Sequence, residues 1–198
     1  MEKILKDAAT TRDRILHATL KIIGKEGFQS ITIKKIADLA EVNIAAVNYH
    51  FGSKTNVINE AMKVLNKKLI KCFEVLENKE ISPEERLRSF LLSYMERALE
   101  YPDIFRNFIY RTINECGENS DYVGFLKKEG IEKIKRALKE AGAKAENEEL
   151  SMKMLQMISS IELPILLGKH MNQLSGIDFD HEEIRVKYTE MILKSLLS

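Results

Sequence analysis

Several residues between Thr32 and Lys54 are of the types that bind nucleic acid. Proteins contact DNA phosphates with hydroxyl groups, cations and the N–H groups at helix starts. Thr32 and Tyr49 supply hydroxyls, and His50 and Lys54 supply nitrogen groups. A cation at a helix start, where Lys54 is expected, is disfavoured by the helix dipole unless an anion binds there. The segment therefore predicts contacts with a phosphate backbone.

The residues between these polar groups are small and suit the DNA major groove. Asn43 is expected to cap a short helix whose first turn is Ile44-Ala45-Ala46. Small or polar side chains near the start of such a helix reach base edges. Asn48 can bond adenine or face solvent, and the sequence leaves both open. The predicted DNA-binding residues are Thr32, Lys34, Asn43, Ile44, Ala45, Ala46, Asn48, Tyr49, His50 and Lys54.

These side chains need a helix-turn-helix to position them, and the sequence predicts one. A first helix over residues 12–26 carries apolar residues at helical spacing. Thr32 is expected to cap a second helix that runs to Ala40, and three residues separate it from the helix that follows Asn43. Two short helices joined by such a turn and braced by a longer one form a helix-turn-helix.

The rest of the chain predicts more helices and no strand. Ser53 is expected to cap a helix that runs to about Glu77, and the start signal Ser82-Pro83-Glu84-Glu85 opens the next one. Later helices are expected over 102–117, over 120–141 as either one helix or a pair divided at Gly130, over 148–172 with a kink at Pro164, and over 180–196. The predicted fold class is all-α with about nine helices, in a DNA-binding domain at 1–54 and a helical effector-binding and dimerisation domain at 55–198.

Composition excludes several classes of protein. The chain is 44% hydrophobic and 31% charged, as in an ordinary globular protein. No apolar run approaches the ~20 residues of a membrane span, and no signal-peptide core is visible, so we expect a cytoplasmic protein. Two cysteines, Cys72 and Cys116, are too few for a disulfide framework, and no metal or cofactor is expected. Residues 1–54 hold nine Lys or Arg against six Asp or Glu, which favours a polyanionic partner.

The helix-turn-helix segment resembles the DNA-binding region of the tetracycline-repressor (TetR) family of bacterial transcriptional regulators. The resemblance rests on TIKKIADLA at residues 32–40, EVNIAAV at 41–47 and NYHFGSK at 48–54, and it covers about residues 12–65. Family members often have glycine at the positions of Glu41 and Ala45, and an aromatic residue at that of Asn48. These departures concern the operator sequence rather than DNA binding itself.

The resemblance implies a homodimer that binds a double-stranded DNA operator and a carboxyl-terminal region that binds a small effector. Aromatic and apolar side chains of that region are expected to line an effector pocket or to fill the core. The expected pocket residues are Phe90, Tyr94, Phe105, Phe108, Ile109, Met157 and Ile161. The last two long helices are expected to pair with those of a partner subunit through Leu155, Ile158, Ile165, Ile184, Tyr188, Met191 and Ile192.

The predicted function is a ligand-responsive transcriptional regulator, a repressor that binds a palindromic operator and is released by a small, mostly apolar effector. One alternative is a helical partner-binding module that its first domain anchors to DNA. An enzyme is the remaining alternative, but the sequence shows no nucleophile–base pair, glycine-rich phosphate loop or cluster of metal ligands.

Overall fold

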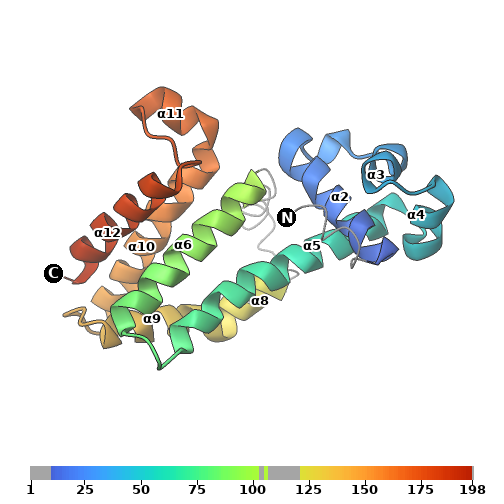
Figure 1. Cartoon of the computed structure of the whole chain (residues 1–198). Helices are drawn as coiled ribbons and strands as arrows, with labels where there is room; N and C mark the ends of the chain where they lie inside the picture. Colours follow the sequence, from blue (N-terminus) through green and yellow to red (C-terminus); the bar gives the residue numbers. More distant parts are fainter. Residues whose placement is uncertain (1–9, 103–104, 107–120, 198) are drawn as a thin grey trace. The chain divides into compact units, whose positions relative to one another are not determined.

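The computed structural model describes residues 10–102, 105–106 and 121–197, and over these ranges the chain forms helices, turns and loops without a strand. The all-α fold class is therefore as predicted. The chain divides into two compact units, an amino-terminal unit of residues 1–66 and a carboxyl-terminal unit of residues 67–198. Figure 1 labels the helices of both units.

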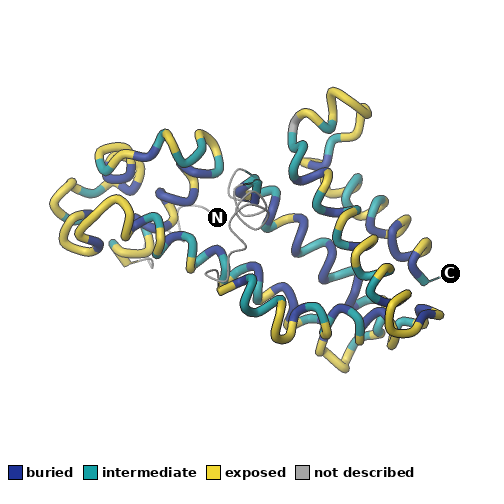
Figure 2. Tube along the Cα trace, turned by 180° about the vertical axis from the view of Figure 1, so that it is seen from behind, coloured by how far each residue is buried: buried dark blue, intermediate teal, exposed yellow. Residues whose placement is uncertain are grey.

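The amino-terminal unit is a cluster of short helices around α2. Its elements are α2 (Thr11–Glu26), the 3-10 turn η1 (Phe28–Ser30), α3 (Ile33–Ala40), α4 (Ile44–Phe51) and most of α5 (Lys54–Lys71). Helix α2 packs against both α3 and α4. Ile15 and Ile23 on α2, Ile36 on α3 and Val47 on α4 are at most 1% exposed and form the core of this unit. Figure 2 shows the same alternation of buried and exposed stretches along each helix.

The carboxyl-terminal unit is organised around α6 (Pro83–Glu100). Its other elements are the 3-10 helix η2 (Cys72–Glu77), α8 (Asp121–Phe125), the π turn η3 (Leu126–Gly130), α9 (Ile131–Glu140), α10 (Asn147–Leu167), α11 (Lys169–Ser175) and α12 (Glu182–Leu197). Helix α6 contacts η2, α9, α10 and α12, and it runs beside α10 and α12 in Figure 1. Leu87, Phe90, Leu91 and Met95 of α6 are at most 1% exposed, so this helix supplies much of the core.

The helix that begins after Ser53 differs from the prediction at its end. The Ser53 hydroxyl accepts a hydrogen bond from the Asn56 N–H at 3.1 Å, as expected of a cap. The α-helix stops at Lys71, however, and continues to Glu77 as the 3-10 helix η2. Side chains three residues apart eclipse in a 3-10 helix, which places Phe73 and Leu76 on one face, where both are buried.

Gly130 ends the π turn that separates α8 from α9, so the segment forms a helix pair, one of the two alternatives that the sequence left open. It has helical backbone angles, φ −60° and ψ −44°, and it lies in the π turn between α8 and α9. A Cβ atom there would lie 2.9 Å from a Leu126 methyl carbon and 3.0 Å from the Phe125 ring. The absence of a Cβ therefore lets the Leu126 and Phe125 side chains pack closely against the backbone here.

The long helix α10 ends earlier than predicted. Instead of running to about residue 172, it stops at Leu167, because Gly168 has a positive φ of 52°. The Arg106 guanidinium donates to the Leu166 carbonyl at 2.7 Å and so satisfies one of the free carbonyls at this helix end. Of the helix predicted over 102–117, only residues 102, 105 and 106 lie within the described residues.

Candidate nucleic-acid interface and effector site

Both helices of the helix-turn-helix begin at side-chain caps. Thr32 Oγ1 accepts a hydrogen bond from the Lys35 N–H at 3.1 Å, and Asn43 Oδ1 accepts one from the Ala46 N–H at 2.7 Å. These bonds satisfy N–H groups of the first helical turns, which no carbonyl of the helix can reach. The cap positions predicted from the sequence are therefore the ones that the chain uses.

Arg14 on α2 braces the turn between α3 and α4. Its guanidinium donates to the Ala40 carbonyl, with the Nη2 atom at 2.5 Å, and to the Glu41 carbonyl at 2.7 Å. Hydrogen bonds from a charged donor are stronger than those between neutral groups. Arg14 therefore fixes the end of α3 against α2, and with it the start of α4.

Glu41 has a left-handed backbone, with φ 55° and ψ 47°, at the end of α3. This conformation is unfavourable for a residue that carries a Cβ atom, and glycine adopts it readily. A glycine at this position would therefore avoid the strain that Glu41 carries.

Glu41→Gly is expected to stabilise the chain relative to Glu41→Ala by about 1 kcal/mol. Both substitutions remove the same carboxylate and its contacts, so their difference isolates the strain of a Cβ atom in the left-handed region. Urea unfolding of the two variants, followed by circular dichroism, measures this difference. Equal midpoints would show that the turn relaxes around the alanine.

The outer face of α4 presents the predicted DNA-binding side chains to solvent. Val47 and Phe51 point inward, at 1% and 7% exposure, whereas Tyr49 is 86% and Ile44 47% exposed. Ala46 is half-buried. The other predicted DNA-binding residues are exposed as well, namely Thr32, Lys34, Asn43, Ala45, Asn48, His50 and Lys54.

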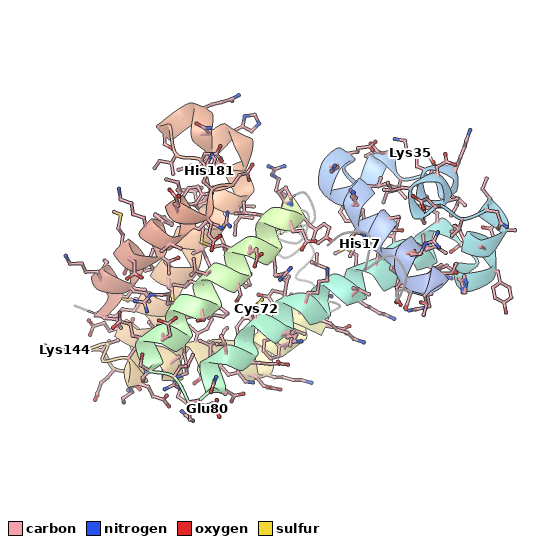
Figure 3. The ribbon with its side chains drawn as sticks, viewed as in Figure 1. His17, Lys35, Cys72, Glu80, Lys144 and His181 are labelled. Carbon is pink, nitrogen blue, oxygen red and sulfur yellow. The ribbon has the colours of Figure 1, made fainter. Side chains whose placement is uncertain are left out.

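The lysines around α3 differ in whether their ammonium groups already have partners within the protein. The Lys54 ammonium donates to the Ile31 carbonyl at 3.1 Å, which holds it near the start of α3. Lys35, labelled in Figure 3, pairs with Glu26 at 2.7 Å and so has part of its charge offset. The neighbouring Lys34 is exposed. Lys34 and Lys54 are therefore the better-placed cations for a phosphate.

Leu39 is an exposed residue of this face that the sequence analysis did not select. It lies on α3 and is 44% exposed, while Ile36, Ala37 and Ala40 of the same helix are buried. Its position was visible in the sequence, because Leu39 is an apolar residue outside the helical spacing of Ile36, Ala37 and Ala40. Such a residue can contact thymine methyl groups or sugar in a groove.

Three of the expected effector residues, Phe90, Tyr94 and Phe105, lie in an aromatic cluster of the carboxyl-terminal unit. Tyr94 contacts the rings of Phe90 and Phe105, with ring centroids 5.7 and 5.9 Å apart. Met157 and Ile161 of α10 are at most 1% exposed. The structure thus buries five of the seven predicted pocket residues, while Phe108 and Ile109 lie outside the described residues.

Two buried tyrosines and a carboxyl group occupy the polar part of this region. The Tyr122 hydroxyl donates to the Tyr94 hydroxyl at 3.0 Å, and both side chains are buried. Burial, together with the neighbouring Tyr122, raises the pKa of Tyr94 well above its ordinary value, and the charge of Glu162 adds to this. Burial also raises the pKa of Glu162 on α10 to about 7. Glu162 and Tyr122 were not selected from the sequence, because neither belongs to a spacing pattern.

Glu162→Gln is expected to raise the free energy of unfolding by about 2 kcal/mol above pH 7. This value is smaller than the full pKa shift of Glu162 implies, because the carboxyl is partly exposed and solvent screens its charge. The Glu162 pKa is about 7 in the folded chain against 4.5 ordinarily. Between these values the unfolded chain loses the proton first, so the native carboxyl costs stability as the pH rises. The advantage of glutamine should therefore disappear toward pH 4.5.

Unfolding of both proteins in urea at pH 5, 6, 7 and 8 measures this dependence. Glu149→Gln on the exposed start of α10 is the control, and it should change stability little at any of these pH values. A constant difference between Glu162→Gln and the parent across the range would contradict the burial of an ionisable carboxyl.

Helices α10 and α12 expose apolar side chains on their outward faces. Leu155 of α10 and Met191 of α12 are each 61% exposed, and the Tyr188 hydroxyl donates to the Ser160 carbonyl at 2.9 Å, which ties the two helices together. Ile158, Ile184 and Tyr188 are half-buried. By contrast, Ile165 and Ile192 are buried within the unit. Met152 and Leu163 of α10 are exposed apolar residues as well.

Helix α10 is also long and apolar enough, by length and composition alone, to cross a membrane. Only 28% of its apolar window is buried. The helix packs against α6, α9 and α12, so its composition is explained by a helical bundle with one uncovered face.

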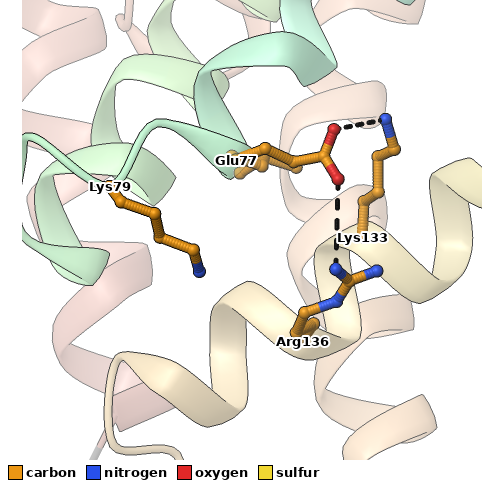
Figure 4. A pocket seen from close by; sticks show the side chains of 5 residues that line it. Glu77, Lys79, Lys133 and Arg136 are labelled. Carbon is orange, nitrogen blue, oxygen red and sulfur yellow. Dashed lines mark hydrogen bonds and ion pairs between the residues drawn. The ribbon is translucent and has the colours of Figure 1, made fainter.

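A small polar cavity lies at the junction of η2 and α9. It is lined by Leu76, Glu77, Lys79, Lys133 and Arg136, and Figure 4 shows Glu77 bridging Lys133 and Arg136 at 2.7 and 3.9 Å. The charges of this cavity are largely paired internally, which does not suit an apolar effector. Among residues 10–102, 105–106 and 121–197, no three His, Cys, Asp or Glu side chains gather as metal ligands would.

Sequence comparison matches residues 15–61 to the family model described as "Bacterial regulatory proteins, tetR family". The HTH-type transcriptional repressor NicS of Pseudomonas putida is 29% identical over 98 residues, which are 50% of this chain and 46% of that protein. The probable HTH-type transcriptional regulator YttP of Bacillus subtilis is 22% identical over 106 residues, 52% of this chain and 51% of that protein. The chain thus matches about half the length of these curated relatives.

Solved structures extend the likeness to nearly the whole fold. A TetR transcriptional regulator from Legionella pneumophila superposes with a TM-score of 0.68 at 20% identity, covering 96% of this chain and 99% of that one. The TetR family regulator PfmR from Thermus thermophilus gives 0.65 at 21% identity, covering 92% and 98%. At such identities the likeness establishes the fold. All four of these proteins are described as transcriptional regulators, and none as an enzyme.

Proposed function

We propose that this chain is a ligand-responsive repressor of the TetR family, whose family model its residues 15–61 match. In this proposal residues 1–54 bind DNA and residues 55–198 bind an effector and form a homodimer in the cytoplasm. The observation that carries the proposal is the exposed face of α4, where polar and small side chains surround a helix whose inner residues are buried. The name of the relative NicS, a repressor, favours repression over activation.

DNA binding by this face follows from its chemistry. The first turn of α4 carries Ile44 and Ala45, which leave room for close approach to base edges. Thr32, Tyr49 and Lys54 offer hydroxyl and ammonium groups to the phosphates on either side. A helix with this distribution binds in the major groove with its N-terminal part toward the bases.

A homodimer would present two copies of α4 to one duplex. The outward apolar face of α10 and α12 supports this part of the proposal, since Leu155 and Met191 are too exposed for a monomer to benefit from them. Two-fold symmetry requires a palindromic operator, with half-sites about one duplex turn, ~34 Å, apart.

An effector that changes this separation by a few ångströms prevents both helices from docking at once. Specific binding is then lost while weak salt-dependent contacts persist.

Selection of duplexes from a random-sequence pool by the purified full-length chain tests the proposal. We expect enrichment of one palindromic sequence, and binding to it whose logarithm falls steeply and linearly with the logarithm of salt concentration. A pool that stays random after repeated rounds would refute DNA-sequence recognition. Enrichment of an asymmetric site would instead refute the dimer.

A further inference from the structure

An open groove lies beside the exposed end of α4, within the amino-terminal unit. It has a volume of about 310 Å³ and is bordered by the start of α2, the end of α4 and the amino-terminal part of α5. Its polar lining residues are Arg12, His50, Asn56, Asn59, Glu60 and Lys63. Among the described residues that line the groove, Glu60 is the only acid.

Arg12 is held in this groove by contacts with both α4 and α5. Its guanidinium carbon lies 5.4 Å from the centroid of the Phe51 ring, and its Nη2 atom lies 2.5 Å from a carboxylate oxygen of Glu60. The ring of Phe51 is 7% exposed, and the Asn56 amide donates to the Phe51 carbonyl at 3.1 Å, so the wall behind Arg12 is itself fixed. A guanidinium stacked on a ring in this way can still present N–H groups to an oxyanion.

Glu60 pairs with both cations of the groove at once. One carboxylate oxygen bonds to Arg12, and the other lies 2.9 Å from the Lys63 ammonium. Hydrogen bonds from Lys63 and Arg12 lower the pKa of Glu60, so the carboxylate is charged at neutral pH. The side chains of Arg12, Glu60 and Lys63 are 46%, 33% and 58% exposed. Ion pairs at such exposure contribute little to stability, and another anion can reach the same cations.

The position of these cations suits a phosphate of the DNA backbone. A phosphodiester offers two free oxygens, as the carboxylate does, and arginine and lysine are the side chains that most often bind it. His50, which the sequence predicts to contact DNA, lines the same groove, and its ring centroid lies 6.2 Å from that of Phe51. A duplex bound at α4 through His50 would therefore bring a phosphate to cations that Glu60 already occupies.

We infer that Glu60 is an internal competitor of the DNA backbone, which holds Arg12 and Lys63 in the free chain and is displaced from them by a phosphodiester. The inference rests on the proposed function, since it concerns the same DNA-binding surface. After displacement the phosphate and the carboxylate lie near each other, and their repulsion opposes binding. Because the backbone is the same in every duplex, Glu60 weakens binding to DNA of any sequence.

Binding of Glu60→Gln to two labelled duplexes tests this inference. The duplexes are the selected palindrome and a scrambled duplex of the same length and composition, each measured over a range of salt concentrations. Glutamine keeps the size of the side chain and removes its charge. We expect Glu60→Gln to bind both duplexes about 10-fold more tightly than the parent at about 50 mM salt, with a logarithmic salt dependence steeper by about one per subunit.

Two further variants separate the proposed competition from a general effect of charge. Glu149→Gln removes an exposed carboxylate from α10 and so changes the net charge equally, and it should bind both duplexes like the parent. Arg12→Gln and Lys63→Gln, added to Glu60→Gln, should abolish the gain, because no cation is then released to the phosphate. Glu60→Ala should show the same gain as Glu60→Gln, and circular dichroism verifies the fold of each variant.

The inference is overturned if folded Glu60→Gln binds no more tightly than the parent, if its gain leaves the salt dependence unchanged, or if the triple variant keeps the gain. Weaker binding by both folded Glu60 variants would show that Glu60 positions the two cations instead of competing for them. If neither the parent nor any variant binds either duplex, the proposed regulator fails as well. Binding by the parent without a gain in Glu60→Gln refutes only the competition, so the two failures are distinguishable.

Discussion

Replacing Tyr49 and His50 together with alanine is expected to weaken binding of the selected palindrome by about 100- to 1,000-fold. Both side chains project from the exposed face of α4, and the Tyr49 ring contacts mainly that of His50, 5.3 Å away. Their removal therefore takes little from the core of the unit. A two-fold dimer loses every contact twice, which is why two modest contacts sum to a large loss.

Fluorescence anisotropy of labelled duplex measures this loss across a range of salt concentrations. Lys21→Ala is the matched control, since it removes an exposed cation from α2 of the same unit, away from the turn. Lys54→Ala is examined alone, because it also breaks the bond to the Ile31 carbonyl. If the double variant holds the palindrome as tightly as the parent, α4 does not dock as proposed.

The helix-turn-helix was predictable because its signals are local. Thr32 and Asn43 are caps that act within three residues of their own positions, and both bonds exist in the fold. The buried stripe of Ile36, Ala37 and Ala40 follows directly from helical spacing. Glu41 was expected to cost stability if its backbone is left-handed, and the fold gives it that conformation.

The carboxyl-terminal unit was less predictable because its helices are apolar on more than one side. The sequence pattern placed Ile165 and Ile192 together with Leu155 and Met191 on one interface. The fold buries the isoleucines in its own core and leaves the other two side chains exposed. Helical spacing shows that a side chain is apolar and periodic, but which neighbour covers it depends on contacts distant in sequence.

Glu162 illustrates a further limit of sequence reasoning. A single carboxyl in an apolar run has no spacing signal, and its local sequence does not show whether a cation will lie nearby. Only packing of α10 against α6 brings it into range of Tyr94, which is distant in the chain. Sites made by such long-range packing have to be found from the fold.

Substituting both Leu155 and Met191 with aspartate is expected to raise the dimer dissociation constant by about 1,000-fold or more, because each new charge would be buried in the interface. The two residues are the most exposed apolar side chains of the α10–α12 face, at 61% each. Two-fold symmetry places four added carboxylates in one interface. Each subunit should keep its fold, since neither side chain belongs to the core.

Sedimentation equilibrium measures the mass of the parent and the variant, and the control is Leu174→Asp. Leu174 lies on α11 and is 74% exposed, so this substitution adds a charge to an exposed apolar position away from the α10–α12 face. We expect a dimer for the parent and the control and a monomer for the double variant. Because a monomer occupies only one half-site, the double variant should also lose specific retention of the palindrome while its α4 surface is intact. A variant that stays dimeric would show that α10 and α12 do not form the subunit interface. The proposed effect of the effector on the separation of the two α4 helices could then not be transmitted through these helices.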